Sequence, residues 1–151
     1  MAEEIFFDEL DVNQINNYLI ILDVDGCVVA DGGQELSASI KQKILELSQS
    51  NEIFFCSNKN YGERLRQLSA QAGIGFLDTI YKKPSKKILR SVRNENGKPL
   101  LVVGDKFLTD GVWAKRIGAK FIKVKRLTTS NDKFLIKIIY WLDDLIYDVA
   151  E

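Results

Sequence analysis

The stretch Leu19-Ile-Ile-Leu-Asp-Val-Asp-Gly26 constrains the fold more than any other part of the chain. Four branched apolar residues in a row, 19–22, are typical of a strand buried on both faces, as in a parallel sheet that helices cover. Ionised carboxylates are costly inside such a layer, so Asp23 and Asp25 are expected at the carboxyl end of the strand, where open α/β sheets bind ligands. Gly26 allows a sharp turn after them. Taken alone, the pattern is more simply explained by a strand that ends in an ordinary Asp-Gly turn.

The rest of the chain alternates helix-like and strand-like segments, which is typical of a parallel sheet with helices on both faces. Helices are expected over 37–47, 61–72, 84–92, 110–117 and 132–149, with further strands over 52–56, 76–80, 99–103 and 119–125. Ser37 is expected to cap the first of these helices, Gly73 to end the second and Pro84 to begin the third. The predicted fold is a Rossmann-like three-layer α/β/α domain with a five-stranded, mainly parallel sheet. The 151 residues are interpreted as one domain, 1–151.

Polar residues follow each of the first four predicted strands. In chain order they are Asp23 and Asp25, Ser57 and Asn58, Lys82 and Lys83, and Asp105 and Asp110. Right-handed crossovers bring the carboxyl ends of parallel strands to one edge of the sheet, so these side chains are expected to form a single site.

The chemistry of such a site suits a phosphate monoester. Carboxylates from two strands offer the oxygen ligands that Mg²⁺ prefers. One carboxylate can attack phosphorus to form an aspartyl-phosphate, and a second acid can protonate the leaving oxygen and later activate water. A serine hydroxyl and a lysine ammonium can hold the phosphoryl oxygens.

These residues resemble the four ordered motifs of the haloacid dehalogenase (HAD) superfamily of phosphatases. The motifs are Asp23-Val-Asp25-Gly, Ser57-Asn58, Lys83-Pro84 and Gly104-Asp105-Lys-Phe-Leu-Thr-Asp110, and the resemblance covers roughly residues 10–130. The resemblance implies that Asp23 is the nucleophile and that Asp25 is the general acid and base. It implies that Ser57, Asn58 and Lys83 bind the substrate phosphate. The implied Mg²⁺ ligands are Asp23, the backbone carbonyl of Asp25, Asp105 and Asp110. Lys83 fits the motif better than Lys82 because it directly precedes Pro84.

The spacing between the motifs indicates which branch of the superfamily the chain resembles most. Only 31 residues separate Asp25 from Ser57 and 25 separate Ser57 from Lys83, so neither interval can hold a cap domain. An open site suits a bulky substrate such as a lipid headgroup, a nucleic acid or a protein. The Gly-Asp-x-x-x-Thr-Asp signature and the short length look most like the capless type IIIA, YqeG-like branch, which includes enzymes that dephosphorylate phosphatidylglycerophosphate. The stretch 23–28 also resembles 3-deoxy-octulosonate 8-phosphate phosphatases, although their fourth motif differs.

The amino-acid composition excludes several other kinds of catalytic and metal site. The chain has no histidine, which excludes histidine-based triads and metal sites. Its two cysteines, Cys27 and Cys56, lack metal-binding spacing, and no signal peptide or membrane-spanning run is evident, so a reduced, cytoplasmic protein is expected. Residues 82–126 hold fourteen bases against three acids, whereas the first forty residues hold nine acids and no base. A basic half beside an acidic cluster suits an anionic substrate near a metal, but solvated helix faces explain many of these lysines equally well.

Several features have simpler alternatives. Asp110 could be an acid at a helix N-terminus, Ser57 a helix cap and Asn58 a turn former. The apolar stripe of the last helix, Leu135, Ile139, Leu142, Ile146 and Val149, is interpreted mainly as core packing, with a homo-oligomer contact or a membrane surface as alternatives. For the whole chain, the alternatives to a phosphatase are a non-catalytic module that binds phosphate or metal, and a phosphotransferase.

Overall fold

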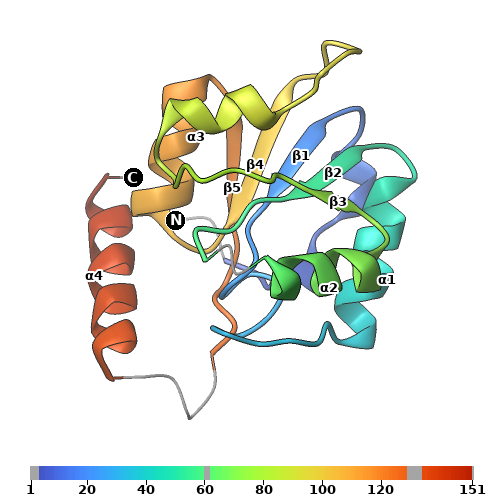
Figure 1. Cartoon of the computed structure of the whole chain (residues 1–151). Helices are drawn as coiled ribbons and strands as arrows, with labels where there is room; N and C mark the ends of the chain where they lie inside the picture. The colour runs from blue at the N-terminus through green and yellow to red at the C-terminus, as the bar shows by residue number, and fades with distance from the viewer. Residues whose placement is uncertain (1–3, 60–61, 129–133, 151) are drawn as a thin grey trace.

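The computed structural model describes residues 4–59, 62–128 and 134–150, and it contains a five-stranded, all-parallel sheet (Figure 1). The spatial order is β3-β2-β1-β4-β5. The strands are β1 (Leu19–Leu22), β2 (Glu52–Phe55), β3 (Gly75–Phe76), β4 (Leu100–Gly104) and β5 (Lys120–Lys123). Leu22 pairs with Phe55 on one side and Val103 on the other, so the three central strands reach the same edge together. The five-stranded sheet predicted from the sequence is therefore confirmed.

Four α-helices and several shorter helical segments connect and flank the strands. They are η1 (Phe7–Glu9), η2 (Val12–Gln14), α1 (Ala38–Ser48), α2 (Glu63–Ala72), η3 (Lys86–Ser91), the π-helical turn η4 (Phe107–Gly111), α3 (Val112–Ile117) and α4 (Phe134–Ala150). Two predicted helix ends are confirmed. The Ser37 hydroxyl accepts a hydrogen bond from the Ile40 amide at 3.3 Å, and Gly73 ends α2 in the left-handed conformation, with φ +69°.

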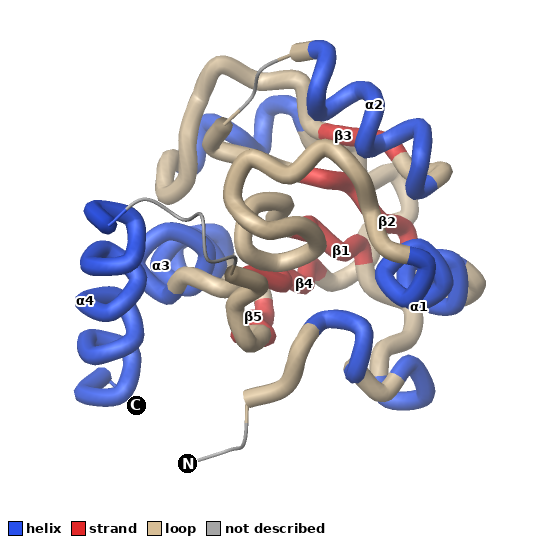
Figure 2. Tube along the Cα trace, turned by 90° about the horizontal axis from the view of Figure 1, so that it is seen from below, coloured by secondary structure: helices blue, strands red, loops and turns tan. Residues whose placement is uncertain are grey.

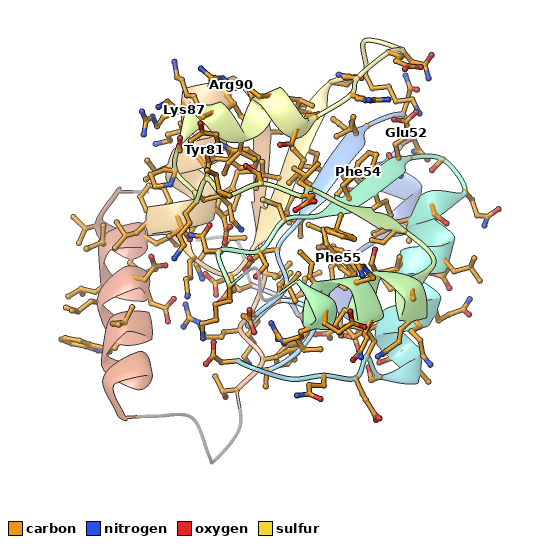
Figure 3. All side chains as sticks on the ribbon, viewed as in Figure 1. Glu52, Phe54, Phe55, Tyr81, Lys87 and Arg90 are labelled. Carbon is orange, nitrogen blue, oxygen red and sulfur yellow. The ribbon has the colours of Figure 1, made fainter. Side chains whose placement is uncertain are left out.

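Helices cover both faces of the sheet. Successive residues of a strand point to opposite faces, so alternate residues belong to two different cores. Ile20 and Leu22 pack into a core that includes residues of α1 and α2, whereas Leu19 and Ile21 pack with Ile88 of η3 and with α3. Phe54 and Phe55 lie on opposite sides of β2 (Figure 3), and an end-on view shows α1 and α3 on either side of the strands (Figure 2). The predicted three-layer arrangement is thus confirmed.

The prediction that Pro84 begins a helix is wrong. The Lys83–Pro84 peptide bond is cis, and the segment that follows is a short 3₁₀-helix that starts at Lys86. Ser85 caps it, because its hydroxyl accepts a hydrogen bond from the Lys87 amide at 3.2 Å. The strand expected over 76–80 is likewise reduced to Gly75–Phe76.

The apolar stripe of α4 is exposed at Ile139, Leu142, Ile146 and Val149, so its interpretation as core packing is wrong for these residues. The side chain of Leu135 lies outside the part of the chain that the structure describes. Trp141 is 63% exposed and Val149 is 81% exposed. The other exposed apolar residues of α4 are Ile139, Leu142, Leu145 and Ile146. The helix lies outside the two covering layers and contacts η4 instead (Figure 1). A homo-oligomer or membrane contact through this face stays a prediction. None of the described helices is both long enough and apolar enough to cross a membrane.

Candidate active site

Three acids from different parts of the chain converge at the carboxyl end of the sheet. One carboxylate oxygen from each of Asp23, Asp105 and Asp110 lies within 4.8 Å of the other two. Asp23 follows β1 directly, and its amide continues the sheet by donating to the Val103 carbonyl at 2.9 Å. Asp105 follows β4, while Asp110 is buried in the turn η4. The sequence predicted that these acids would meet, and the structure brings them together.

Two glycines make room for this convergence. A Cβ atom at Gly26 would lie 2.8 Å from the Cγ of Asp105, and one at Gly104 would lie 2.8 Å from the Cβ of Asp110. Gly26 also has φ +81°, a conformation that side chains rarely tolerate. The glycines in the first and fourth motifs therefore allow the acids to approach one another.

Lys83 is the basic residue at the centre of the acids. Its Nζ lies 2.8 Å from Asp23 Oδ1, 2.6 Å from Asp110 Oδ1 and 3.1 Å from the Cys56 carbonyl. The side chain of Asn58 holds Lys83 in place, because its Oδ1 accepts from the Lys83 amide at 2.7 Å and its Nδ2 donates to the Lys83 carbonyl at 3.1 Å. Lys83 is therefore buried against the acids, whereas Lys82 is exposed. Asn58 positions Lys83, and its phosphate contact stays a prediction.

The charges of these groups are strongly coupled. Burial alone would lower the pKa of Lys83, but the nearby Asp110 and Asp23 carboxylates hold it well above its usual value. Burial is the largest influence on Asp23 and by itself would raise its pKa, but the Lys83 ammonium, the hydrogen bonds to the carboxylate and the charge of Lys106 together lower it. Burial and then the charge of Asp23 raise the pKa of Asp110 to about 7, and the same two causes hold the pKa of Asp105 well above its ordinary value. The Lys83 ammonium contacts two of the three acids, and the Arg126 guanidinium, which Asp144 shares, contacts the third.

The donor set fits a hard divalent cation. Asp105 Oδ1 is the buried side-chain oxygen that lacks a hydrogen-bond partner among the residues that the structure describes. Its Oδ2 accepts from Arg126 Nε at 3.0 Å. A buried, unpartnered carboxylate oxygen costs free energy unless something binds it, and Mg²⁺ prefers carboxylate oxygens. Asp23, Asp105 and Asp110 could therefore hold Mg²⁺.

The carboxylate of Asp25 lies outside this group of three and pairs with an arginine. Arg64 Nη2 lies 2.6 Å from Asp25 Oδ1, and Nη1 lies 3.2 Å from Oδ2. The Gly32 amide and the Ser57 hydroxyl also donate to this carboxylate, at 2.8 and 3.4 Å. These contacts orient Asp25, and the role predicted for its backbone carbonyl at the metal stays a prediction. Nothing in the sequence singles out Arg64, because it is one of several charged residues on the amphipathic helix α2.

A small cavity of about 70 Å³ connects the predicted catalytic and phosphate-binding residues. Its lining comprises Asp23, Asp25, Ser57, Asn58, Lys59, Lys83, Lys106 and Thr109. The Ser57 hydroxyl also accepts from the Lys59 amide at 3.0 Å, so its turn-forming and site-lining roles coexist. The sequence assigns no site role to Lys59, which follows the second motif, or to Lys106 and Thr109, which lie within the fourth, because it does not reveal the direction of their side chains.

Comparison with known protein families gives a match over residues 6–127 to the family described as mitochondrial PGP phosphatase. The matched span includes all four motifs and both arginines that contact the acids. The comparisons with curated proteins and with solved structures found no match. Because the family match covers most of the chain, the chain belongs to the mitochondrial PGP phosphatase family and is a phosphatase of the HAD type.

Proposed function

We propose that this protein is a Mg²⁺-dependent phosphomonoesterase that acts through an aspartyl-phosphate on Asp23. The observation that carries the proposal is the group of three buried carboxylates, two of which contact the Lys83 ammonium. One of them, Asp23, lines a cavity together with Asp25 and Ser57. Bound Mg²⁺ would offset the repulsion between the nucleophile and the substrate phosphate and stabilise charge on the transferred group.

The reaction takes place in two displacements on these side chains. A carboxylate oxygen of Asp23 forms a bond to phosphorus while the bond from phosphorus to the leaving oxygen breaks, and Asp25 gives that oxygen a proton. Water then gives a proton to Asp25 and bonds to phosphorus, the bond to Asp23 breaks, and inorganic phosphate leaves. The lowered pKa of Asp23 supports its role as nucleophile, because the carboxylate is ionised at neutral pH. Ser57 and Lys83 would hold phosphoryl oxygens, a role that their position in the lining of the cavity supports.

We further propose phosphatidylglycerophosphate as the substrate. The family description names PGP, and the chain resembles the capless branch that acts on this lipid. In the structure, the intervals between the motifs form α1 with β2 and α2 with β3, so no described segment forms a cap domain over the site. An open site is what a phosphate monoester on a bulky lipid headgroup requires.

An assay of phosphate release tests the proposal. The substrates are an aryl phosphate and phosphatidylglycerophosphate in mixed micelles, and each is assayed with Mg²⁺ and with a chelator. We expect hydrolysis that depends on Mg²⁺ and that Asp23→Asn reduces by more than about 10³-fold, with Asp148→Asn, an exposed acid far along the chain, as the control. Acid-quenched protein should carry phosphate on Asp23. A parent protein that binds Mg²⁺ or phosphate but hydrolyses neither substrate would instead be a non-catalytic binding module. Hydrolysis of the aryl phosphate alone would overturn the lipid assignment and keep the phosphatase mechanism.

A further inference from the structure

A second and larger cavity adjoins the catalytic one. Its volume is about 510 Å³, and it shares Ser57, Asn58 and Lys59 with the catalytic cavity before extending along residues 79–82. Small-molecule sites typically measure about 300–1,000 Å³. The catalytic cavity of about 70 Å³ is only a little over twice the share of one water molecule in the liquid, which is about 30 Å³. The small cavity suits a phosphoryl group, and the larger cavity adjoins it at Ser57, Asn58 and Lys59, where a leaving group can extend.

The larger cavity is lined by groups that bind anions. Lys59 and Lys82 are its two cations, and Asn58 and Thr79 add hydrogen-bonding side chains. Lys59 is already paired with Asp31. Lys82 is exposed and forms no ion pair with any residue in the described part of the chain, so its charge remains available to a ligand.

The apolar part of the lining lies beside these cations. Tyr81 lines the cavity, and Lys87 Nζ lies 5.4 Å from the centre of its ring. Both side chains are labelled in Figure 3. Ile80, which is 89% exposed, belongs to the lining as well. This combination suits a ligand with an anionic group joined to a short carbon chain better than a purely apolar one.

We propose that the larger cavity binds a second anionic group of the substrate, a phosphodiester carried on the leaving group, and that Lys82 is its main charge partner. The inference rests on the proposed phosphomonoesterase function. In phosphatidylglycerophosphate a glycerol unit joins the phosphodiester to the phosphomonoester, so one molecule would occupy both cavities. The neighbours Lys82 and Lys83 then divide the work, since Lys83 faces the reacting phosphate and Lys82 the phosphate that stays on the product.

The test compares a substrate that has the second phosphate with one that lacks it. The values of kcat and KM are measured for short-chain phosphatidylglycerophosphate and for an aryl phosphate, with the parent, Lys82→Gln and Lys86→Gln. Lys86 is the control because it is an exposed lysine of η3 that lines neither cavity. We expect Lys82→Gln to lower kcat/KM on the order of tenfold more for the lipid than for the aryl phosphate, mainly through KM, because one charge-assisted contact is lost. Lys82→Arg should restore the preference and Lys86→Gln should keep it. Equal losses on both substrates, or the same loss in Lys86→Gln, would overturn the inference.

A binding measurement separates this inference from the proposed hydrolysis. Short-chain phosphatidylglycerol has the phosphodiester but no phosphomonoester, so its binding requires no turnover. Titration calorimetry measures its Kd. We expect Lys82→Gln to raise this Kd on the order of tenfold relative to the parent, and Lys86→Gln to leave it unchanged. If the parent fails to hydrolyse any substrate but shows this pattern, the cavity assignment holds and the mechanism fails. If Lys82→Gln binds the lipid as tightly as the parent, the cavity assignment is wrong.

Discussion

Arg64 connects two parts of the site that lie 39 residues apart in the chain. Its guanidinium group contacts both oxygens of Asp25, and its Nε donates to the Gly33 carbonyl at 2.9 Å, so it joins the loop after β1 to helix α2. A planar, two-pronged contact of this kind sets the direction of a carboxylate, which a single point charge does less well. Arg64 is therefore a positioning residue for the proposed acid–base group.

Replacing Arg64 should impair the proton-transfer step more than substrate binding. General acid–base catalysis contributes about 10²- to 10⁴-fold, so we expect Arg64→Gln to lower kcat by roughly ten- to a hundredfold and to change its pH profile, with a smaller change in KM. Arg64→Lys should recover only part of kcat. Arg66→Gln, on the same helix and largely exposed, is the matched control. A loss of thermal stability with an unchanged pH profile would contradict the positioning role.

Gly26 and Gly118 allow backbone strain to be separated from crowding at the acids. Both have positive φ, +81° and +72°. A Cβ atom at Gly26 would collide with Asp105, whereas a Cβ atom at Gly118, which ends α3, would have no described heavy atom within 4 Å beyond its chain neighbours. Each alanine substitution should lower stability by about 1 kcal/mol through φ alone. We expect only Gly26→Ala to displace Asp105 as well and to abolish Mg²⁺-dependent hydrolysis, as measured by phosphate release and thermal denaturation. Equal activity in the two variants would show that the close approach is not needed.

At the scale of elements, α4 supports the fourth motif although it lies beyond the span that matches the family. The carboxylate of Asp143 accepts from the amides of Phe107 and Leu108, both at 2.8 Å, which satisfies the first amides of η4. Arg126 contacts Asp105 with one edge and Asp144 of α4 with the other, at 3.0 Å in each case. Two acids of α4, Asp143 and Asp144, therefore face the rest of the protein, while the described side chains of its apolar stripe are exposed.

The contact between α4 and η4 predicts a coupled loss of stability and metal affinity. Asp143→Ala leaves two backbone amides without their acceptor, which should lower the free energy of unfolding by about 1–3 kcal/mol. Because η4 contains Asp110, we also expect a weaker apparent affinity for Mg²⁺ in hydrolysis. Asp148→Ala, an exposed acid on the same helix, is the control. Denaturant unfolding and Mg²⁺ titration measure the two effects, and an Asp143→Ala protein with parental Mg²⁺ dependence would contradict the coupling.

For the whole molecule, the buried acids link stability to pH. The pKa of Asp110 rises from its ordinary 3.8 to about 7 in the folded protein, so its contribution to stability is present below pH 4 and is lost as the pH rises through 7. Asp105 is shifted in the same direction. Asp23 is shifted the other way, so its contribution is present above its ordinary pKa and is lost in acid. Without a divalent cation the protein should be less stable at pH 8 than near pH 5.

Mg²⁺ should reverse this loss, because the ion replaces protons on the same oxygens. At a hundred times its Kd, a ligand that binds only the folded protein adds about 2.7 kcal/mol. We expect the rise in Tm on adding Mg²⁺ to be larger at pH 8 than at pH 5, and to be greatly reduced in Asp105→Asn. Thermal denaturation with Mg²⁺ or a chelator measures it. A rise that is independent of pH, or equal in Asp105→Asn, would show that Mg²⁺ acts elsewhere.

The sequence by itself determined the strands, their parallel arrangement and the edge at which Asp23, Lys83, Asp105 and Asp110 meet. These follow from local patterns, since apolar runs specify buried strands and parallel topology places their ends at one edge. Only the tertiary structure decided that Arg64 holds Asp25, that α4 supports η4 with its apolar face exposed, and that a second cavity lies beside Lys82. Such features depend on how distant segments are oriented in space, and a charged residue on a helix has the same local pattern whether it faces solvent or a buried acid.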